Sequence, residues 1–270
     1  MELVITFLKT MNRFGTDAHT AAMIRSFVRC LLAGAAFNTR GMQNISLVFC
    51  MQPGLEAIYP DAKEYRAALR RYVRHYQSHP FWMPCLVGLF LHMERAIAVG
   101  RMPAAALAKV KDTTAYTLSA IGDSVFAGSF LIFWALGTIC LLLQGHTLLP
   151  LLIGILFFVG LQAFRAYTFM AGFQGGFLFL ERLRRWNLIN WGSRVKYANA
   201  VLLVWLWTLV WPHPLVWWQW LPGVAGLILF GRFVRTGMVS RFIAALAFLA
   251  LLQFYPLVRG GILDILEAMG

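Results

Sequence analysis

Four polar side chains in otherwise apolar surroundings are the residues of this sequence whose types could do chemistry: Asn38, Gln43, Glu94 and Asp123. Asn38 and Gln43 lie close together in the chain, and their amides could either cap a re-entrant helix or offer hydrogen bonds to a sugar. Sugar hydroxyls both donate and accept hydrogen bonds, so neutral amides and carboxylates are the groups that suit them. The spacing by itself leaves both roles of the amides open.

The two carboxylates also have structural alternatives. Asp123 could cap the first turn of a helix, where it would complement the helix dipole. It could also line a polar pathway, because an ionisable residue at membrane depth is costly and tends to be functional. The two roles of Asp123 are compatible with each other. Glu94 stands beside Arg95, with which it could form a surface ion pair.

Signatures of enzymes and metal sites are missing from the sequence, which contains no phosphate loop, no HExxH and no GxSxG. His75 and His79 are four residues apart, a spacing that would place both on one face of a helix. However, Pro80 disfavours helical geometry at His79, and no third metal ligand is near. We therefore expect no catalytic constellation, no metal site and no cofactor. The cysteines lack CxxC spacing and lie in apolar surroundings, which favours small buried side chains over a disulfide frame. They are Cys30, Cys50, Cys85 and Cys140.

The composition is that of an integral membrane protein. Of the 270 residues, 60% are hydrophobic and 13% are charged, whereas a soluble domain needs roughly a quarter of its residues charged to cover its surface. A net charge of +13 can indicate nucleic-acid binding. Here it accompanies long uncharged segments, and lysines and arginines gather in the cytoplasmic loops of membrane proteins. We therefore expect the lipid bilayer, and no nucleic acid, as a partner.

Uncharged stretches predict the membrane spans. Residues 124–164 carry no charge and would extend ~60 Å as helix, enough to cross a ~30 Å hydrocarbon core twice. The polar turn Gln144–Thr147 divides them into a helical hairpin with Asp123 at its start. A second hairpin is expected over residues 197–231, with a Pro-His-Pro turn among interfacial tryptophans, and a last span over residues 242–258.

Other segments are expected to lie at the membrane surface or to enter it partway. The uncharged residues between Arg165 and Glu181 have basic flanks that should share one side, which predicts a re-entrant or interfacial segment. Residues 61–76 form an amphipathic helix whose basic face is solvated, contacts anionic headgroups, or docks a specific partner. The basic clusters on either side of the second hairpin place those flanks in the cytoplasm.

We therefore expect an all-α, polytopic membrane protein with about five transmembrane spans plus re-entrant or interfacial helices. The chain divides into three regions. Residues 1–20 are an N-terminal segment without the pattern of a secretory signal peptide. Residues 21–115 hold amphipathic and re-entrant helices, including the cytoplasmic basic helix, and residues 116–260 are the transmembrane helical region.

A series of short motifs follows in order along the chain: Phe37-Asn38, Met42-Gln43, Pro53, Tyr59-Pro60, Gln77-Ser78-His79-Pro80, His92-Met93-Glu94, Ile121-Gly122-Asp123, Gly172-Phe173-Gln174-Gly175 and Leu221-Pro222-Gly223. Together they resemble the IID membrane component of mannose/fructose/sorbose-type bacterial sugar phosphotransferase systems. The resemblance covers residues 25–258, and the ordered agreement of so many motifs makes it specific.

The resemblance implies a division of labour among several chains. A IID chain pairs with a IIC chain in the bacterial cytoplasmic (inner) membrane, where the two multi-pass subunits form the sugar pathway and assemble as an oligomer. Separate cytoplasmic IIA and IIB units carry phosphate and phosphorylate the incoming hexose-type sugar, so IID itself is a non-catalytic subunit. Carried over by position, Asn38, Gln43, Glu94 and Asp123 become the sugar-binding candidates. Three glycines, Gly122, Gly172 and Gly175, would shape the backbone of the pathway.

Three positions depart from the family pattern. Arg40 stands where the family has Glu, Gly34 where it often has Gln, and Ser124 where it has Pro after the aspartate. Replacing a carboxylate by a cation changes the hydrogen bonding offered to a sugar. The sequence therefore leaves open an alternative, a divergent and transport-inactive regulatory or scaffold protein of the membrane. A membrane enzyme acting on lipids is disfavoured because no catalytic constellation is present.

Overall fold

The computed structural model describes residues 17–210, 220–235 and 237–253, and apart from two isolated β-bridges every regular element in those residues is a helix. The expected all-α class is therefore confirmed. The chain divides into two compact units, Met1–Val210 and Trp211–Gly270. The main helices of the first unit are α2 (Asp17–Leu31), α3 (Asn44–Ile58), α4 (Ala62–Arg70), α5 (Met83–Ala98), α6 (Ala104–Gly122), α7 (Leu131–Leu143), α8 (Leu148–Gly175), α9 (Phe177–Arg185) and α10 (Leu188–Val210). The described helices of the second unit are α11 (Trp220–Arg235) and α12 (Met238–Gln253).

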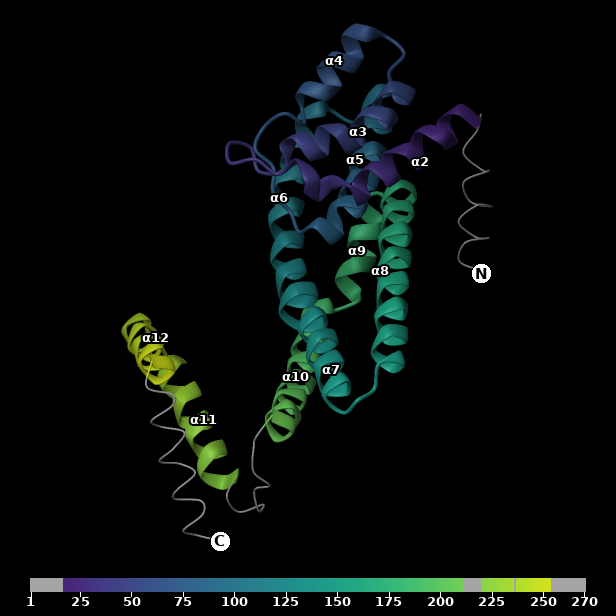
Figure 1. Cartoon of the computed structure of the whole chain (residues 1–270). Coiled ribbons are helices and arrows are strands. Elements are labelled where there is room, and N and C mark those ends of the chain that lie inside the picture. The colour runs from purple at the N-terminus through teal and green to yellow at the C-terminus, as the bar shows by residue number, and fades with distance from the viewer. Residues whose placement is uncertain (1–16, 211–219, 236, 254–270) are drawn as a thin grey trace, which may run out of the picture. The chain divides into compact units, whose positions relative to one another are not determined.

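Helix α5 lies at the centre of the first unit, because every residue from Met83 to Leu91 is buried. It packs against the second half of α8, with a glycine from each helix at the crossing. A side chain on Gly172 would come within 2.7 Å of the Cys85 carbonyl oxygen, and one on Gly88 would overlap the Phe169 carbonyl oxygen. The backbones of α5 and α8 can therefore approach this closely only because both residues lack a Cβ. Figure 1 shows α2–α5 gathered at one end of this unit, with α7, α8 and α10 extending away from them.

Two helical stretches are long and apolar enough to cross a membrane. Helix α6, a π-helical segment η3 (Asp123–Phe130) and α7 form one continuous helix over Ala104–Leu143, and α8 is the second stretch. Only 17% and 11% of their most apolar windows are buried, so these are not core helices of a soluble domain. The turn between α7 and α8 falls at residues 144–147, where the sequence predicted it.

The structure differs from the expectations in the segment after residue 164. Helix α8 continues through Arg165 to Gly175, so the separate re-entrant segment expected here does not form. The Arg165 guanidinium is accommodated because its Nη2 donates to the Cys30 carbonyl at 2.9 Å and its Nη1 to Gln162 Oε1 at 3.3 Å. The break comes at Gly176, whose φ of 50° turns the chain into α9.

The expected amphipathic helix over residues 61–76 is shorter than predicted. Asp61 caps α4, its Oδ1 accepting from the backbone N–H of Lys63 at 2.8 Å and of Glu64 at 2.9 Å. The helix ends at Arg70, after which the chain turns inward and buries Tyr72. Helices α10, α11 and α12 occupy the predicted second hairpin and last span, while the predicted Pro-His-Pro turn and residues 254–258 lie outside the described residues.

Candidate functional site

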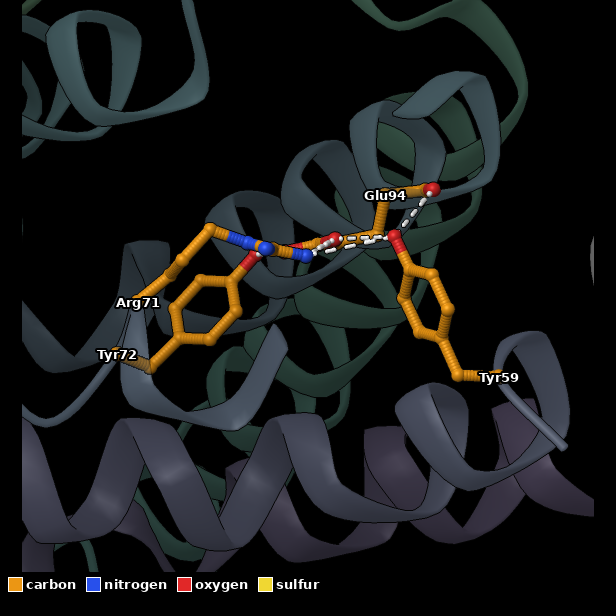
Figure 2. A network of polar contacts seen from close by, with 4 residues as sticks. All are labelled: Tyr59, Arg71, Tyr72 and Glu94. Atoms are coloured by element: carbon orange, nitrogen blue, oxygen red, sulfur yellow. Dashed lines mark hydrogen bonds and ion pairs between the residues drawn. The ribbon is translucent and has the colours of Figure 1, made fainter. Parts of the chain in front are cut away.

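Glu94, on α5, is the centre of a buried polar cluster (Figure 2). The Arg71 guanidinium donates two hydrogen bonds to the Glu94 carboxylate, from Nε to Oε1 at 2.9 Å and from Nη2 to Oε2 at 2.5 Å. The hydroxyls of Tyr59 and Tyr72 donate to Oε2 at 2.8 Å and to Oε1 at 2.7 Å. The surface ion pair between Glu94 and Arg95 does not form, because Glu94 is 0% exposed and the Arg95 guanidinium lies over the Phe173 ring instead.

The protonation states of the cluster are mutually consistent. Burial, together with the hydrogen bond and the charge of Glu94, raises the pKa of the Tyr59 and Tyr72 phenols, so both hydroxyls remain donors. Burial lowers the pKa of Arg71, but the hydrogen bonds and charge of Glu94 outweigh it, so the net direction is upward. A carboxylate offers about four acceptor directions, and four donors occupy them here. Through these bonds Glu94 links α5 to two other parts of the chain, the end of α3 and the segment that follows α4.

The side-chain amide of Asn38 is used to fold its own loop. Its Oδ1 accepts from the Gly41 N–H at 2.7 Å, and its Nδ2 donates to the Met42 carbonyl at 3.1 Å and to Asn44 Oδ1 at 2.9 Å. Met42 has a φ of 58°, the left-handed conformation that such a tight loop requires. Asn38 therefore fixes the shape of the loop that leads into α3.

The amide of Gln43 joins this loop to the segment before α5. Gln43 is buried, and its Oε1 accepts from the Ser78 N–H at 3.2 Å. The neighbouring His79 is extended, with a ψ of 133°, as the proline after it predicted. A side chain on Gly122 would overlap the Cβ of His79. One chain of contacts therefore runs from Asn38 through Gln43 and His79 to the residue before Asp123, whereas Glu94 lies in a separate cluster.

Asp123 lies inside a continuous helix and not at the start of one. Its backbone is helical, with φ −61° and ψ −43°, and the helix that contains it begins at Ala104, so the N-capping role is wrong. The side chain is exposed. Burial lowers the pKa of His79, and the charge of Asp123 opposes that shift. Within the part of the chain that the structure describes, no hydrogen bond or ion pair engages the Asp123 carboxylate.

Asp123 opens the π-helical segment η3, which polar side chains of α10 hold in place. Ser129 Oγ donates to the Ser124 carbonyl at 2.7 Å and lies 3.0 Å from the Gly192 carbonyl oxygen. Asn199 Nδ2 donates to the Ser129 carbonyl at 3.0 Å, and Lys196 Nζ donates to Ser124 Oγ at 3.3 Å. Segments of π-helix occur frequently at functional sites.

The sequence interpretation missed these α10 residues, although a signal for them exists. Lys196 and Asn199 are three residues apart, which places both on one face of a helix. Asn199 is buried, and its Oδ1 has no hydrogen-bond partner among the described residues. Ser124, where the family pattern has proline, supplies the acceptor for Lys196.

The uncharged stretches of three helices begin at one common level of the first unit. They are bounded by Asp123, Arg165 and Lys196. Next to these boundaries, the ring centroids of Phe126 and Phe164 lie 5.5 Å apart, and Lys196 bonds to the residue after Asp123. Asp123 therefore lies close to the charged residues that bound the uncharged stretches of α8 and α10, and we call this level the charge boundary.

Comparison with known proteins places this geometry in context. A family profile described as the mannose/fructose/sorbose family IID component of the phosphotransferase system matches residues 18–198. The mannose-specific EIID components of Escherichia coli strains K12 and O157:H7 are each 31% identical over 153 residues, which is 56% of this chain and 54% of theirs. The chain thus spans about half the length of the curated relatives it matches.

Two solved structures share the helical fold. One is described as the structure of a membrane protein, with a TM-score of 0.60 and 24% identity, and the similarity covers 68% of each chain. The other is a chain in the cryo-EM structure of the mannose transporter ManYZ in complex with microcin E492, with a TM-score of 0.53 and 23% identity. That similarity covers 87% of this chain and 96% of the other.

Proposed function

Because the chain belongs to the mannose/fructose/sorbose family of IID components of the phosphotransferase system, we propose that it forms a sugar translocation pathway together with a IIC subunit. The observation that carries this proposal is the family match over residues 18–198, which includes all four candidate sugar-binding residues. Cytoplasmic IIA and IIB units would supply the phosphate to a hexose-type sugar. The match to a chain of a mannose transporter supports the same partnership.

The common charge boundary supports a membrane arrangement for this subunit. From it, residues 124–143 would extend about 30 Å as helix and residues 148–164 about 25 Å, close to the thickness of a hydrocarbon core. These arms would be the first two spans, and α10, α11 and α12 would bring the number to about five. Residues 21–115 would then lie mainly at the cytoplasmic surface of the inner membrane, and residues 116–260 would be the multi-pass region.

Asp123 is the candidate that is free to touch a sugar directly. Its carboxylate is exposed and has no hydrogen bond to another described residue, so it could accept hydrogen bonds from sugar hydroxyls. Asn38 would contribute by holding its loop, and Gln43 by joining that loop to the segment of His79, which packs against Gly122. Glu94 would contribute indirectly, by holding α3 and α5 together.

Co-expression with IIA, IIB and IIC proteins of the same phosphotransferase family tests the proposal. Membrane vesicles that carry the complex are expected to take up and phosphorylate a radiolabelled hexose. If the assembled complex transports and phosphorylates no hexose, the transport role is wrong and the regulatory or scaffold alternative is favoured.

Substitution separates the role of Asp123 from that of the fold. We expect Asp123→Asn to lower uptake roughly tenfold or more, because removing one charged partner of a hydrogen bond costs about 1.5–3 kcal/mol. Asp112→Asn is the matched control, since Asp112 is also exposed on α6, and it should leave uptake unchanged. Equal uptake in the two variants would remove Asp123 from the pathway.

A further inference from the structure

A cluster of cations surrounds the break between α9 and α10, and we refer to it as the α9–α10 basic corner. Its members are Arg182, Arg184, Arg185, Arg194 and Lys196, all of them exposed. Glu181 is the one acid between residues 177 and 199. In the residues that the structure describes, the single ion pair is Arg71–Glu94, so the positive charge of the corner is not neutralised within the described chain.

Large apolar side chains are exposed in the same corner. Leu178 is 70% exposed and Tyr197 77% exposed, and Ile189 and Trp191 are exposed as well. The Arg194 guanidinium lies over the Trp191 ring, 5.2 Å from its centroid. Tryptophan, tyrosine and arginine that are exposed together are typical of the membrane–water interface, where the apolar part enters the lipid and the charge stays at the headgroups.

Contacts within the first unit place this corner at the charge boundary described above. Lys196 bonds to Ser124, the first residue of the uncharged stretch that runs through η3 into α7. At the end of α9 the Trp186 ring lies 6.5 Å from that of Phe164, the last uncharged residue of the same stretch in α8. Below Lys196, α10 exposes Val201 and Leu203, so the apolar surface of the corner continues onto the membrane-facing surface of α10.

We propose that the α9–α10 basic corner binds the phosphate headgroups of anionic phospholipids. Guanidinium groups suit phosphate because they present several N–H donors in a planar fork, and clusters of basic residues beside a membrane span attract anionic lipids. An acidic protein surface is a poorer occupant, because it would leave Leu178, Ile189 and Tyr197 next to polar groups. The inference rests on the proposed role as a membrane subunit, but it does not require sugar transport.

Native mass spectrometry of the purified full chain in detergent tests this inference, with phosphatidylglycerol and phosphatidylcholine as the two probes. Wild-type protein is expected to retain phosphatidylglycerol more tightly than phosphatidylcholine. The variant R182Q/R184Q/R185Q should lose about tenfold or more of the phosphatidylglycerol affinity, whereas R182K/R184K/R185K should keep most of it. The matched control is K63Q/R66Q/R70Q, which removes three exposed cations from α4 and should change neither affinity.

Several outcomes would overturn the inference. Equal retention of the two lipids by wild-type protein would do so, and so would equal loss in the α9 and α4 variants. If the α9 variant kept its phosphatidylglycerol but no longer co-purified with a phosphocarrier unit, the corner would be a protein-docking surface. The circular dichroism spectrum of each variant shows whether it is folded, and failure of sugar uptake would leave the lipid result unaffected.

Discussion

Helices α4 and α9 have the same length and the same net charge but lie in different surroundings. Both have nine residues, and the last turn holds one basic residue in α4 and three in α9. After α4, Arg71 turns inward and pairs with the buried Glu94, and the exposed residues of the helix are alanine or charged. In α9 the arginines stay exposed, and Phe177 and Leu178 are exposed with them. A helix of the same net charge is therefore followed in one case by a buried ion pair, Arg71–Glu94, which we call the internal clamp, and in the other case presents its cations on an exposed surface.

The difference arises from the neighbours of each helix. The buried carboxylate of Glu94 lies beside the end of α4, so its charge offsets the cost of removing the Arg71 guanidinium from water. No acid lies within ion-pair distance of the arginines of α9 in the described part of the chain, so they remain where water or headgroups can solvate them. Charge content alone could not have distinguished the two helices.

Breaking the internal clamp is expected to have the largest effect. Glu94→Ala should lower the free energy of unfolding by about 3–5 kcal/mol, because the Arg71 guanidinium and the Tyr72 phenol lose their carboxylate acceptor, while the Tyr59 hydroxyl keeps only the backbone carbonyl of residue 94. Chemical denaturation in detergent, followed by circular dichroism, measures this change. Glu64→Ala is the control on the exposed face of α4, and it should change the same free energy by less than ~0.5 kcal/mol. Similar values for the two variants would contradict the clamp.

The start of α9 is expected to be the next most sensitive point. Gly176→Ala should cost about 1–3 kcal/mol of stability, because Gly176 has a positive φ and the new Cβ would overlap the His92 ring. Gly160→Ala on α8 meets open space and should change stability by less than ~1 kcal/mol. Thermal unfolding of both variants in one detergent makes the comparison, and a lower melting temperature for Gly160→Ala than for Gly176→Ala would refute it.

The start of α4 depends on a side-chain cap instead of a glycine. Asp61→Ala should cost about 1 kcal/mol, because two backbone N–H groups of the first turn lose their acceptor. Asp61→Asn keeps a capping oxygen and should recover most of that loss. The same denaturation assay measures both variants, and an Asn variant as unstable as the Ala variant would show that the cap is not the cause.

Neutralising one exposed arginine in each helix is expected to have the smallest effect. In detergent alone, Arg66→Gln and Arg184→Gln should each change stability by less than ~0.5 kcal/mol. Added phosphatidylglycerol should raise the melting temperature of wild-type protein and of Arg66→Gln, because a ligand that binds the folded state stabilises it. The melting temperature of Arg184→Gln should rise by less when phosphatidylglycerol is added. Identical gains in all three proteins would remove the functional difference between the helices.

The sequence predicted those features that depend on local pattern. The polar turn at residues 144–147 was predicted to divide an uncharged stretch long enough for two crossings, and the structure has the turn there. The four cysteines were predicted to be small buried side chains, and all four are buried and free. Pro80 correctly excluded helical geometry at His79.

Features that depend on distant contacts could not be predicted in this way. Glu94 was placed beside Arg95, but its partner is Arg71, brought near by the turn after α4. Arg165 was taken as the end of a span, yet the Cys30 carbonyl allows α8 to continue through it. Capping was one of the two roles left open for Asp123, and it is wrong because the helix runs past this residue, whose side chain stays exposed.

The π-helical segment η3 changes which side chains of α6 and α7 lie on the same face of the long helix. In η3 the hydrogen bonds skip one residue more than in an α-helix, as between the Leu131 N–H and the Phe126 carbonyl. A stripe of side chains that is traced along α6 with the α-helical period therefore falls out of phase when it reaches α7. Deleting one residue within η3 would convert a wide turn to an α-helical turn and keep the register of both flanks. Deleting one residue within α7 would instead rotate every following side chain by about 100°.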